Sequence, residues 1–186
     1  MKLVLAGTGA SGAIYLQRLL LALDPKAHEI HLVLSAYARQ VIVEELGELV
    51  IPPGVHSHGD KSMNVPFVSG SAPFDAMVVI PCSMGTLGRI ASGVSDSVIL
   101  RAADVFLKER RRLVLVPRET PWSLIHARNV VSLIEAGAVI LPACPGFYSR
   151  PQTIESLVDS LVHRVLDHLG LPVPEAFRWA EPLPAE

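Results

Sequence analysis

The sequence contains little cysteine. Of its 186 residues only Cys82 and Cys144 are cysteines, and each lies beside a proline. Two cysteines so far apart make neither a disulfide framework nor a metal-binding spacing, so we interpret both as small buried residues and expect no bound metal. A chain without a disulfide framework suits a reducing compartment. Because Met1 and Lys2 lead directly into a predicted strand, we expect no secretory signal and a cytoplasmic location.

Long apolar runs and a strong net charge are also missing. No stretch of 18 apolar residues occurs, so we expect no membrane span. The formal net charge is −2, which excludes a global basic field for nucleic acid. Yet half of the residues are hydrophobic and the mean hydropathy is +0.41. We expect this surplus to lie in subunit interfaces of a large homo-oligomer.

Short apolar runs alternate with helical patterns along the chain. This alternation predicts an α/β fold, a doubly wound parallel sheet in one domain over residues 1–170, followed by a proline-rich tail over 171–186. Residues 47–75, which include His56 and His58, predict a long irregular excursion. The predicted strands are 2–6, 29–34, 76–80, 113–116 and 138–141, and the predicted helices are 10–23, 36–46, 84–92, 96–109, 121–136 and 153–169.

The first strand runs into a glycine-rich turn, Gly9-Ala10-Ser11-Gly12. Such a turn at a helix start lets the backbone approach a phosphate or a ring. The second strand is followed by Ser35, and no acid is placed to bind a ribose. A mononucleotide such as FMN therefore fits better than NAD. The alternative is simple tight packing of strand against helix.

Another predicted strand ends at Ser83-Met84-Gly85-Thr86. Two hydroxyl groups and a glycine at a helix start form a polar rim suited to a ligand. The alternative interpretation is an ordinary helix N-cap.

The stretch from residue 101 to 126 holds the most chemistry. Arg101 and Lys108 are seven residues apart on a predicted helix, so they share one face. After the next strand comes the pair Arg118-Glu119, where Thr120 and Pro121 predict the start of another helix. A cation beside a carboxylate at the carboxyl end of a strand indicates an anionic ligand and proton transfer. A surface ion pair is the alternative.

Two further features stand out. Glu44 and Glu45 close the second predicted helix, where the helix dipole disfavours acids, which indicates a functional role; the alternative is a solvated surface pair. Spacing alone does not separate Glu44 from Glu45. The last predicted helix is amphipathic with Arg164 at the edge of its apolar stripe. The tail beyond it carries Trp179, which we expect either to dock on a neighbour or to belong to a frayed terminus.

Four motifs resemble the UbiX-type flavin prenyltransferases over nearly the whole chain. They are TGASGA (8–13), PCSMGTL (81–87), RAADVFLKERRRLVLVPRE (101–119) and LPACPGFYSRPQ (141–152). The resemblance implies a Rossmann- or flavodoxin-like fold and a dodecamer with sites at subunit interfaces. It also implies transfer of a dimethylallyl group from dimethylallyl monophosphate to N5 and then C6 of reduced FMN. The product, prenylated FMN, would go to a UbiD-type decarboxylase.

The resemblance also implies roles for individual residues. The expected flavin contacts are Gly9, Ala10, Ser11, Ser35, Ser83, Met84, Gly85, Thr86 and Arg118. The expected contacts to the prenyl phosphate are Lys108, Tyr148, Arg164 and Trp179. Ser11, Glu45, Arg101, Lys108 and Glu119 fall at positions implicated in the chemistry, with Glu119 as a proton relay to the departing phosphate and Ser11 and Glu45 assisting ring closure.

Two other classes of function remain open. One is a flavin-dependent decarboxylase of cysteine-containing substrates, whose members typically use a histidine near the second helix. The predicted second helix here contains no histidine. The other is a non-catalytic flavin carrier, which the presence of Lys108 and Glu119 does not favour.

Overall fold

The computed structural model describes residues 1–179, so the part of the predicted tail at 180–186 lies outside the described residues. A six-stranded sheet forms the centre, in the order β3-β2-β1-β4-β5-β6, and all the paired strands are parallel. The doubly wound α/β fold is thereby confirmed, and the strand order is that of Rossmann-type sheets. The strands are β1 (Lys2–Gly7), β2 (Glu29–Leu34), β3 (His56–Gly59), β4 (Ala76–Cys82), β5 (Arg112–Pro117) and β6 (Val139–Ile140).

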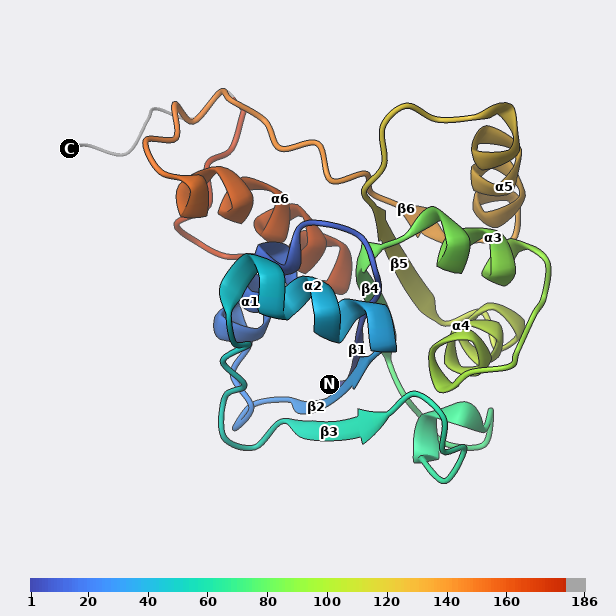
Figure 1. Cartoon of the computed structure of the whole chain (residues 1–186). Helices are drawn as coiled ribbons and strands as arrows, with labels where there is room; N and C mark the ends of the chain where they lie inside the picture. The colour runs from blue at the N-terminus through green and yellow to red at the C-terminus, as the bar shows by residue number, and fades with distance from the viewer. Residues whose placement is uncertain (180–186) are drawn as a thin grey trace.

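Helices cover both faces of the sheet (Figure 1). One apolar core joins α1, α2 and α6 to one face, and a second joins α3 and α4 to the other, where α5 packs on α3. The helices are α1 (Ala13–Ala22), α2 (Ala36–Leu46), α3 (Met84–Ala91), α4 (Val98–Lys108), α5 (Leu124–Glu135) and α6 (Ile154–Leu169).

The central strands are apolar because both of their faces are covered. Every residue of β4 is buried, and alternate side chains of β1 enter opposite cores: Leu3 and Leu5 face α1 and α6, whereas Val4 and Ala6 face the α3–α4 side. Continuous apolar runs are the signature of parallel strands of this kind.

The excursion at 47–75 is more ordered than the sequence predicts. It contains β3 and a short 3-10 helix, η1 (Pro66–Val68). β3 pairs with β2, and His58 Nε2 lies 2.8 Å from His31 Nδ1. The prediction of an irregular excursion was wrong here because HSHG has no apolar alternation, and pairing with a neighbouring strand decides its conformation.

The start of α5 also differs from the prediction. Thr120 and Pro121 do not open this helix, which begins at Leu124 with Ser123 as its N-cap. The Ser123 hydroxyl accepts a hydrogen bond from His126 N at 3.2 Å, and Ser123 N donates to His126 Nδ1 at 3.3 Å. This reciprocal capping box satisfies the helix start better than Thr120 would.

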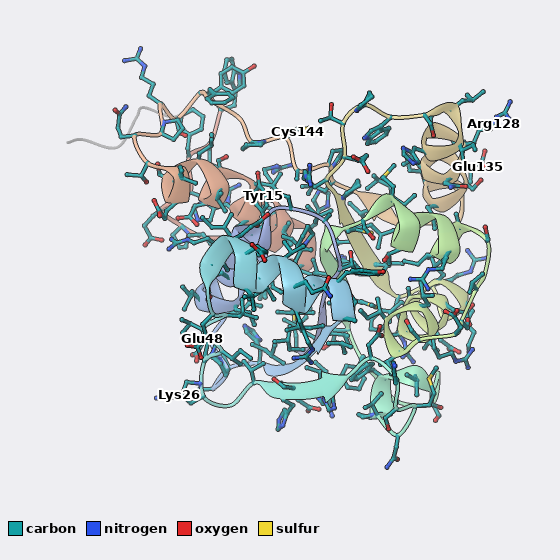
Figure 2. All side chains as sticks on the ribbon, in the orientation of Figure 1. Tyr15, Lys26, Glu48, Arg128, Glu135 and Cys144 are labelled. Atoms are coloured by element: carbon teal, nitrogen blue, oxygen red, sulfur yellow. The ribbon has the colours of Figure 1, made fainter. Side chains whose placement is uncertain are left out.

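Arg128 and Glu135 extend from α5 into solvent, and Cys144, after β6, lies beside Tyr15 of α1 (Figure 2). Cys82 is buried but Cys144 is exposed, so the interpretation of both cysteines as buried residues is confirmed for Cys82 and wrong for Cys144. Within residues 1–179, no helix has the length and apolar character needed to cross a membrane. The same residues hold no group of three or more ligating side chains arranged for a metal ion.

Candidate functional site

Four connections meet at the carboxyl edge of the sheet, where the strand order reverses at β1. These are the turns that follow β1, β2, β4 and β5. Backbone hydrogen bonds tie them together: Ser35 N donates to Gly7 O at 3.1 Å, and Arg118 N donates to Cys82 O at 3.3 Å. In open parallel sheets this edge is where ligands bind.

Thr8 joins the turn after β1 to the turn after β4. Its hydroxyl donates to Pro81 O at 2.9 Å and accepts from Ser83 N at 2.7 Å. The side chain is 2% exposed, so both hydrogen bonds are shielded from water. Thr8 therefore fixes the spacing between two of the connections that line the edge.

Glycines allow the β1 turn its close approach to α2. A Cβ on Gly9 would lie 2.4 Å from Tyr37 Cβ, a distance that real contacts do not show. Gly12 has φ +111°, a left-handed conformation that side chains rarely adopt. The absence of a side chain at Gly9 therefore lets the turn pack closely against Tyr37 at the start of α2.

Hydroxyl groups at two helix starts form the polar rim. Ser35 caps α2 by accepting from Ala38 N at 3.1 Å. Ser83 caps α3, and its hydroxyl donates to Thr86 Oγ1 at 3.1 Å. The Ser35 and Thr86 hydroxyl hydrogens are not used by these contacts, so both can donate to an anionic ligand. The N-cap interpretation and the ligand interpretation are therefore compatible.

Glu45, rather than Glu44, reaches the site. Its Oε2 accepts hydrogen bonds from Gly12 N at 2.9 Å and Ala13 N at 2.8 Å. Gly12 has no side chain to cap α1, so the carboxylate at the end of α2 supplies the cap from another helix. The acid that the dipole of α2 disfavours is stabilised at the positive end of α1.

The environment of Glu45 keeps its carboxyl group ionised. Partial burial acts to raise its pKa, but hydrogen bonds from Ser11, Gly12 and Ala13 together with the charge of Arg118 outweigh it, and the pKa lies below its ordinary value. Glu45 is therefore a proton acceptor at neutral pH, not a donor.

Arg118 and Glu119 lie at the same edge of the sheet, directly after β5. Arg118 Nε donates to Ser11 O at 3.0 Å, which places a cation beside the glycine-rich turn. The exposed Glu119 accepts from Thr120 N at 3.0 Å, and its carbonyl accepts from Trp122 Nε1 at 3.1 Å. The structure thus brings Ser11, Glu45 and Arg118 together, with Glu119 following directly in the chain.

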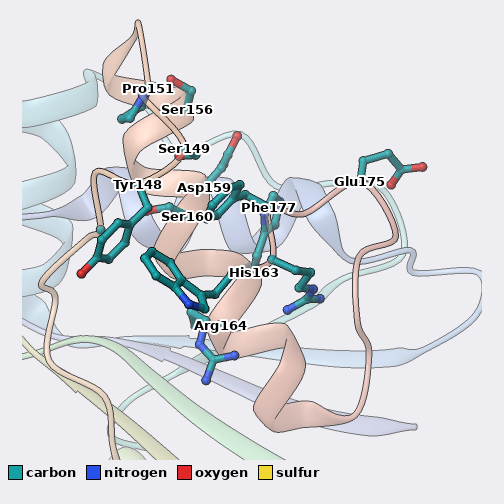
Figure 3. Close-up of a pocket in the computed structure, with 13 residues that line it drawn as sticks. Tyr148, Ser149, Pro151, Ser156, Asp159, Ser160, His163, Arg164, Glu175 and Phe177 are labelled. Carbon is teal, nitrogen blue, oxygen red and sulfur yellow. The ribbon is translucent and has the colours of Figure 1, made fainter. Parts of the chain in front are cut away.

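A separate pocket of about 700 Å³ lies between α6, the segment 146–151 and the start of the tail (Figure 3). Tyr148, Arg164 and Trp179 all line it, so three of the four predicted contacts to the prenyl phosphate do gather. The Tyr148 and Trp179 rings meet edge to face with centroids 4.8 Å apart. Both are largely exposed, at 69% and 75%, so this aromatic pair is open to a ligand.

Arg101 and Lys108 are not brought to either site within one chain. Arg101 Nε donates to Val68 O at 3.2 Å, and Lys108 pairs with Glu109 close to Gly70. The expectation that Lys108 lies beside Tyr148 and Arg164 is therefore not met within one chain. The physical reason is that a helix preceding a parallel strand ends at the amino edge of the sheet, opposite the ligand edge.

Sequence reasoning gave no role to Thr8 or to Asp167. Thr8 follows a buried strand directly, which is a signal for an edge hydroxyl. Asp167 lies in the last turn of α6, where the dipole disfavours an acid, and it is three residues from Arg164. The same argument that singled out Glu45 would have found it.

Residues 1–166 match the protein family described as Flavoprotein. Among curated relatives, the flavin prenyltransferase UbiX of Pseudomonas aeruginosa is 43% identical over 198 residues, covering 97% of this chain and 94% of the relative. The flavin prenyltransferase UbiX of Methanocaldococcus jannaschii is 41% identical, covering 96% of this chain and 98% of the relative.

Solved structures agree with this likeness. A dodecameric FMN-dependent UbiX-like decarboxylase from Escherichia coli has a TM-score of 0.91 and 42% identity, and the match covers 97% of this chain and all of that one. AnUbiX in complex with FMN and dimethylallyl pyrophosphate has a TM-score of 0.90 and 44% identity, with 97% of each chain covered. The likeness therefore extends over nearly the whole fold.

Proposed function

Because this chain belongs to the UbiX flavin prenyltransferases within the flavoprotein family, we propose that it transfers a dimethylallyl group to reduced FMN. The carbon–oxygen bond to the phosphate breaks and a bond forms to flavin N5, which loses its proton as inorganic phosphate leaves. The prenyl double bond then takes up a proton and closes on C6, and loss of the C6 ring proton gives prenylated FMN. One observation carries the proposal. Four connections meet at the carboxyl edge of the sheet, where the strand order reverses, and flavin prenyltransferases match the chain over nearly its whole length.

The carboxyl edge of the sheet fits FMN. Ser35 and Thr86 offer hydroxyl donors, and Arg118 offers a cation, to the phosphate of the flavin. The start of α1 is capped by Glu45, so its N–H groups do not serve the phosphate directly. Glu45 instead stands as an ionised base beside Ser11, in position to accept the ring proton through that hydroxyl.

The pocket beside α6 fits a prenyl phosphate. Arg164 and the Tyr148 hydroxyl supply donors for the phosphate, and the Tyr148–Trp179 ring pair supplies an apolar surface for the dimethylallyl group. The proposed donor is dimethylallyl monophosphate. The complex of AnUbiX holds the pyrophosphate, so both forms belong in the assay.

The test is to incubate the protein anaerobically with reduced FMN and each dimethylallyl phosphate, and then to measure the mass and absorbance of the flavin. The expected product is a flavin heavier by one prenyl unit with an altered spectrum. Unchanged FMN with both donors would refute the proposal. Loss of a carboxyl group from a cysteine-containing peptide would instead support the decarboxylase alternative, although α2 contains no histidine to serve it.

We also propose that the protein assembles as a dodecamer, like its relative from Escherichia coli, and that Arg101 and Lys108 enter the site of a neighbouring subunit. Both cations lie on α4, away from their own chain's site. Light scattering measures the assembly. Mixed oligomers of the Arg101→Ala and Glu119→Ala variants should regain activity if sites are shared between subunits, and no recovery after verified subunit exchange would contradict sharing.

The proposed destination of the product is a UbiD-type decarboxylase in the cytoplasm. Prenylated FMN is of use only to an enzyme that binds it, so a consuming partner must exist. Adding the product mixture to an inactive UbiD-type apoenzyme should restore its decarboxylation of an aromatic or unsaturated acid.

A further inference from the structure

We propose that Asp167 and Arg178 are positioning residues of the prenyl phosphate pocket. The Asp167 carboxylate holds the Arg164 guanidinium and, through Arg178, fixes the chain segment that carries Trp179. This inference rests on the proposed function, because it assigns Arg164, Tyr148 and Trp179 to the binding of the prenyl phosphate.

The contacts form a compact group. Asp167 Oδ2 accepts from Arg164 Nη1 at 2.8 Å and from Arg178 Nη1 at 2.6 Å. Asp167 Oδ1 accepts from Arg178 Nη2 at 2.8 Å, which makes the pair with Arg178 bidentate. The side chain of Asp167 is 17% exposed, against 30% for Arg178 and 59% for Arg164. The Asp167 carboxylate is therefore the most buried of the three groups, and the Arg164 guanidinium lines the pocket.

The two arginines stabilise the negative charge of Asp167 at a position where the helix dipole disfavours it. Asp167 lies in the last turn of α6, where the helix dipole repels a negative charge. Its pKa is nevertheless lowered, chiefly by the hydrogen bonds from Arg178, with the charges of both arginines acting in the same direction against burial. The two guanidinium groups offset the dipole, so the acid stays ionised.

The bidentate pair anchors the chain next to Trp179. After Gly170 ends α6 with φ +77°, the chain turns back along the helix and buries Ala176. Trp179 itself is 75% exposed and meets the Tyr148 ring edge to face. Since so little of the indole is buried, the bidentate pair of the adjacent Arg178 and the burial of Ala176 are the contacts that hold this segment.

The same carboxylate orients Arg164. Residues three apart on a helix share a face, so Asp167 can hold Arg164 Nη1 without distorting α6. A guanidinium has five N–H donors, and one contact leaves the others for phosphate oxygens. An arginine already ordered loses less conformational entropy when it binds a ligand.

A competing interpretation predicts the opposite effect of Asp167 on the affinity for the prenyl phosphate. Asp167 occupies the position of an anion between two guanidinium groups, so it could compete with the phosphate for them. Removal of its charge would then strengthen binding of the prenyl phosphate instead of weakening it.

The test compares Asp167→Asn and Arg178→Gln with Arg89→Gln as the control. Arg89 of α3 pairs with Asp96 at 3.5 Å, and this exposed ion pair lies outside the pocket. The measured quantities are kcat, KM for dimethylallyl monophosphate and KM for reduced FMN, together with the fluorescence anisotropy contributed by Trp179, obtained by difference from a Trp179→Phe protein.

We expect either variant to raise KM for the prenyl phosphate roughly 2- to 12-fold, the factor for ordering one such side chain, and to lower the Trp179 anisotropy. The KM for FMN should not change, and Asp167→Glu should recover part of the loss. The double variant should cost no more than the larger single one, because both remove the same contact. Arg89→Gln should leave both KM values unchanged.

Other outcomes overturn the proposal. A lower KM in Asp167→Asn would establish the competing interpretation, and unchanged KM and anisotropy in Arg178→Gln would remove the anchoring role. If Asp167→Asn does not fold, Arg178→Gln decides alone, since Arg178 lies beyond α6. A wild-type protein that makes no prenylated flavin refutes the proposed function instead, and in that case the anisotropy still tests the anchor.

Discussion

Replacing Glu45 tests both the cap of α1 and the chemistry proposed for this residue. In Glu45→Ala, Gly12 N and Ala13 N lose their acceptor, and Gly12 has no side chain to replace it. Loss of a helix N-cap costs about 0.5–2 kcal/mol, and loss of an acid at a helix N-terminus about 0.3–1 kcal/mol. Because Glu45 is exposed, solvent screening reduces the charge contribution, so we expect a total of about 1–2 kcal/mol.

This loss should be visible in thermal unfolding. For a chain of this size 1 kcal/mol shifts Tm by roughly 2–4 °C, so Glu45→Ala should lower Tm by roughly 2–8 °C. Glu44→Ala is the matched control, since Glu44 is the adjacent exposed acid on the same helix and its variant should change Tm by much less. All proteins are compared at one concentration, because the Tm of an oligomer depends on it.

The pH dependence has a defined sign. The folded pKa of Glu45 lies below its ordinary value, so the carboxylate stabilises the fold above the pKa of the unfolded chain. That stabilisation is lost as the pH falls through the lower folded pKa. The Tm difference between wild type and Glu45→Ala should therefore be full at neutral pH and shrink in acid. A difference that stays constant with pH, or one that Glu44→Ala reproduces, would refute the capping argument.

The same position separates structure from catalysis. Glu45→Gln keeps an amide oxygen for the cap but cannot accept a proton at neutral pH. We expect near-normal FMN binding and a smaller loss of Tm than in Glu45→Ala, because the amide keeps the acceptor but not the charge. Formation of the fourth ring should be impaired, which the absorbance spectrum of the product shows; its mass does not change on ring closure. A normal product yield would move the base elsewhere.

Three more predictions concern ligands and thiols. Arg164→Ala and Lys108→Ala should each weaken use of dimethylallyl phosphate roughly 10- to 150-fold, which corresponds to one charge-assisted hydrogen bond, and should spare FMN. Tyr148→Phe should have a smaller effect because it keeps the ring. Steady-state kinetics at varied prenyl phosphate measure these effects, and an unchanged KM with a lower Tm would show that Arg164 is only structural. The protein should bind FMN in clear preference to NAD by calorimetry, since no acid follows β2 to hold a ribose, and equal affinities would contradict the assignment. Iodoacetamide should modify the exposed Cys144 and spare Cys82, because burial raises the pKa of the Cys82 thiol to about 12, and mass spectrometry of peptides decides it.

Much of the fold was predictable because parallel strands covered on both faces read as apolar runs. β1, β4 and β5 were found in this way, as was the gathering of Ser83 and Arg118 at one edge. β3 escaped because its residues, His56–Gly59, carry no apolar alternation and take their conformation from β2.

The residues of the site could be named from the sequence, but several of their contacts could not. Glu45 caps a helix start 33 residues earlier in the chain, a partner that no local pattern reveals. The subunit to whose site Lys108 contributes was not predictable, because sequence spacing gives the face of a helix but not which edge of the sheet the helix end reaches. Both limits concern contacts between elements, which depend on the direction in which each helix runs.

The excursion between β2 and β4 also limits how this protein can be redesigned. Asp60 accepts from the first turn of α4 through its backbone and its carboxylate, and Arg101 and Arg111 bind the carbonyls of residues 68–72. These hydrogen bonds hold α4 and the residues after it against residues 60–72. A loop transplanted from a relative would need the matching α4 with it, so the two form one exchangeable module although the contacts between them join residues 33 to 41 positions apart.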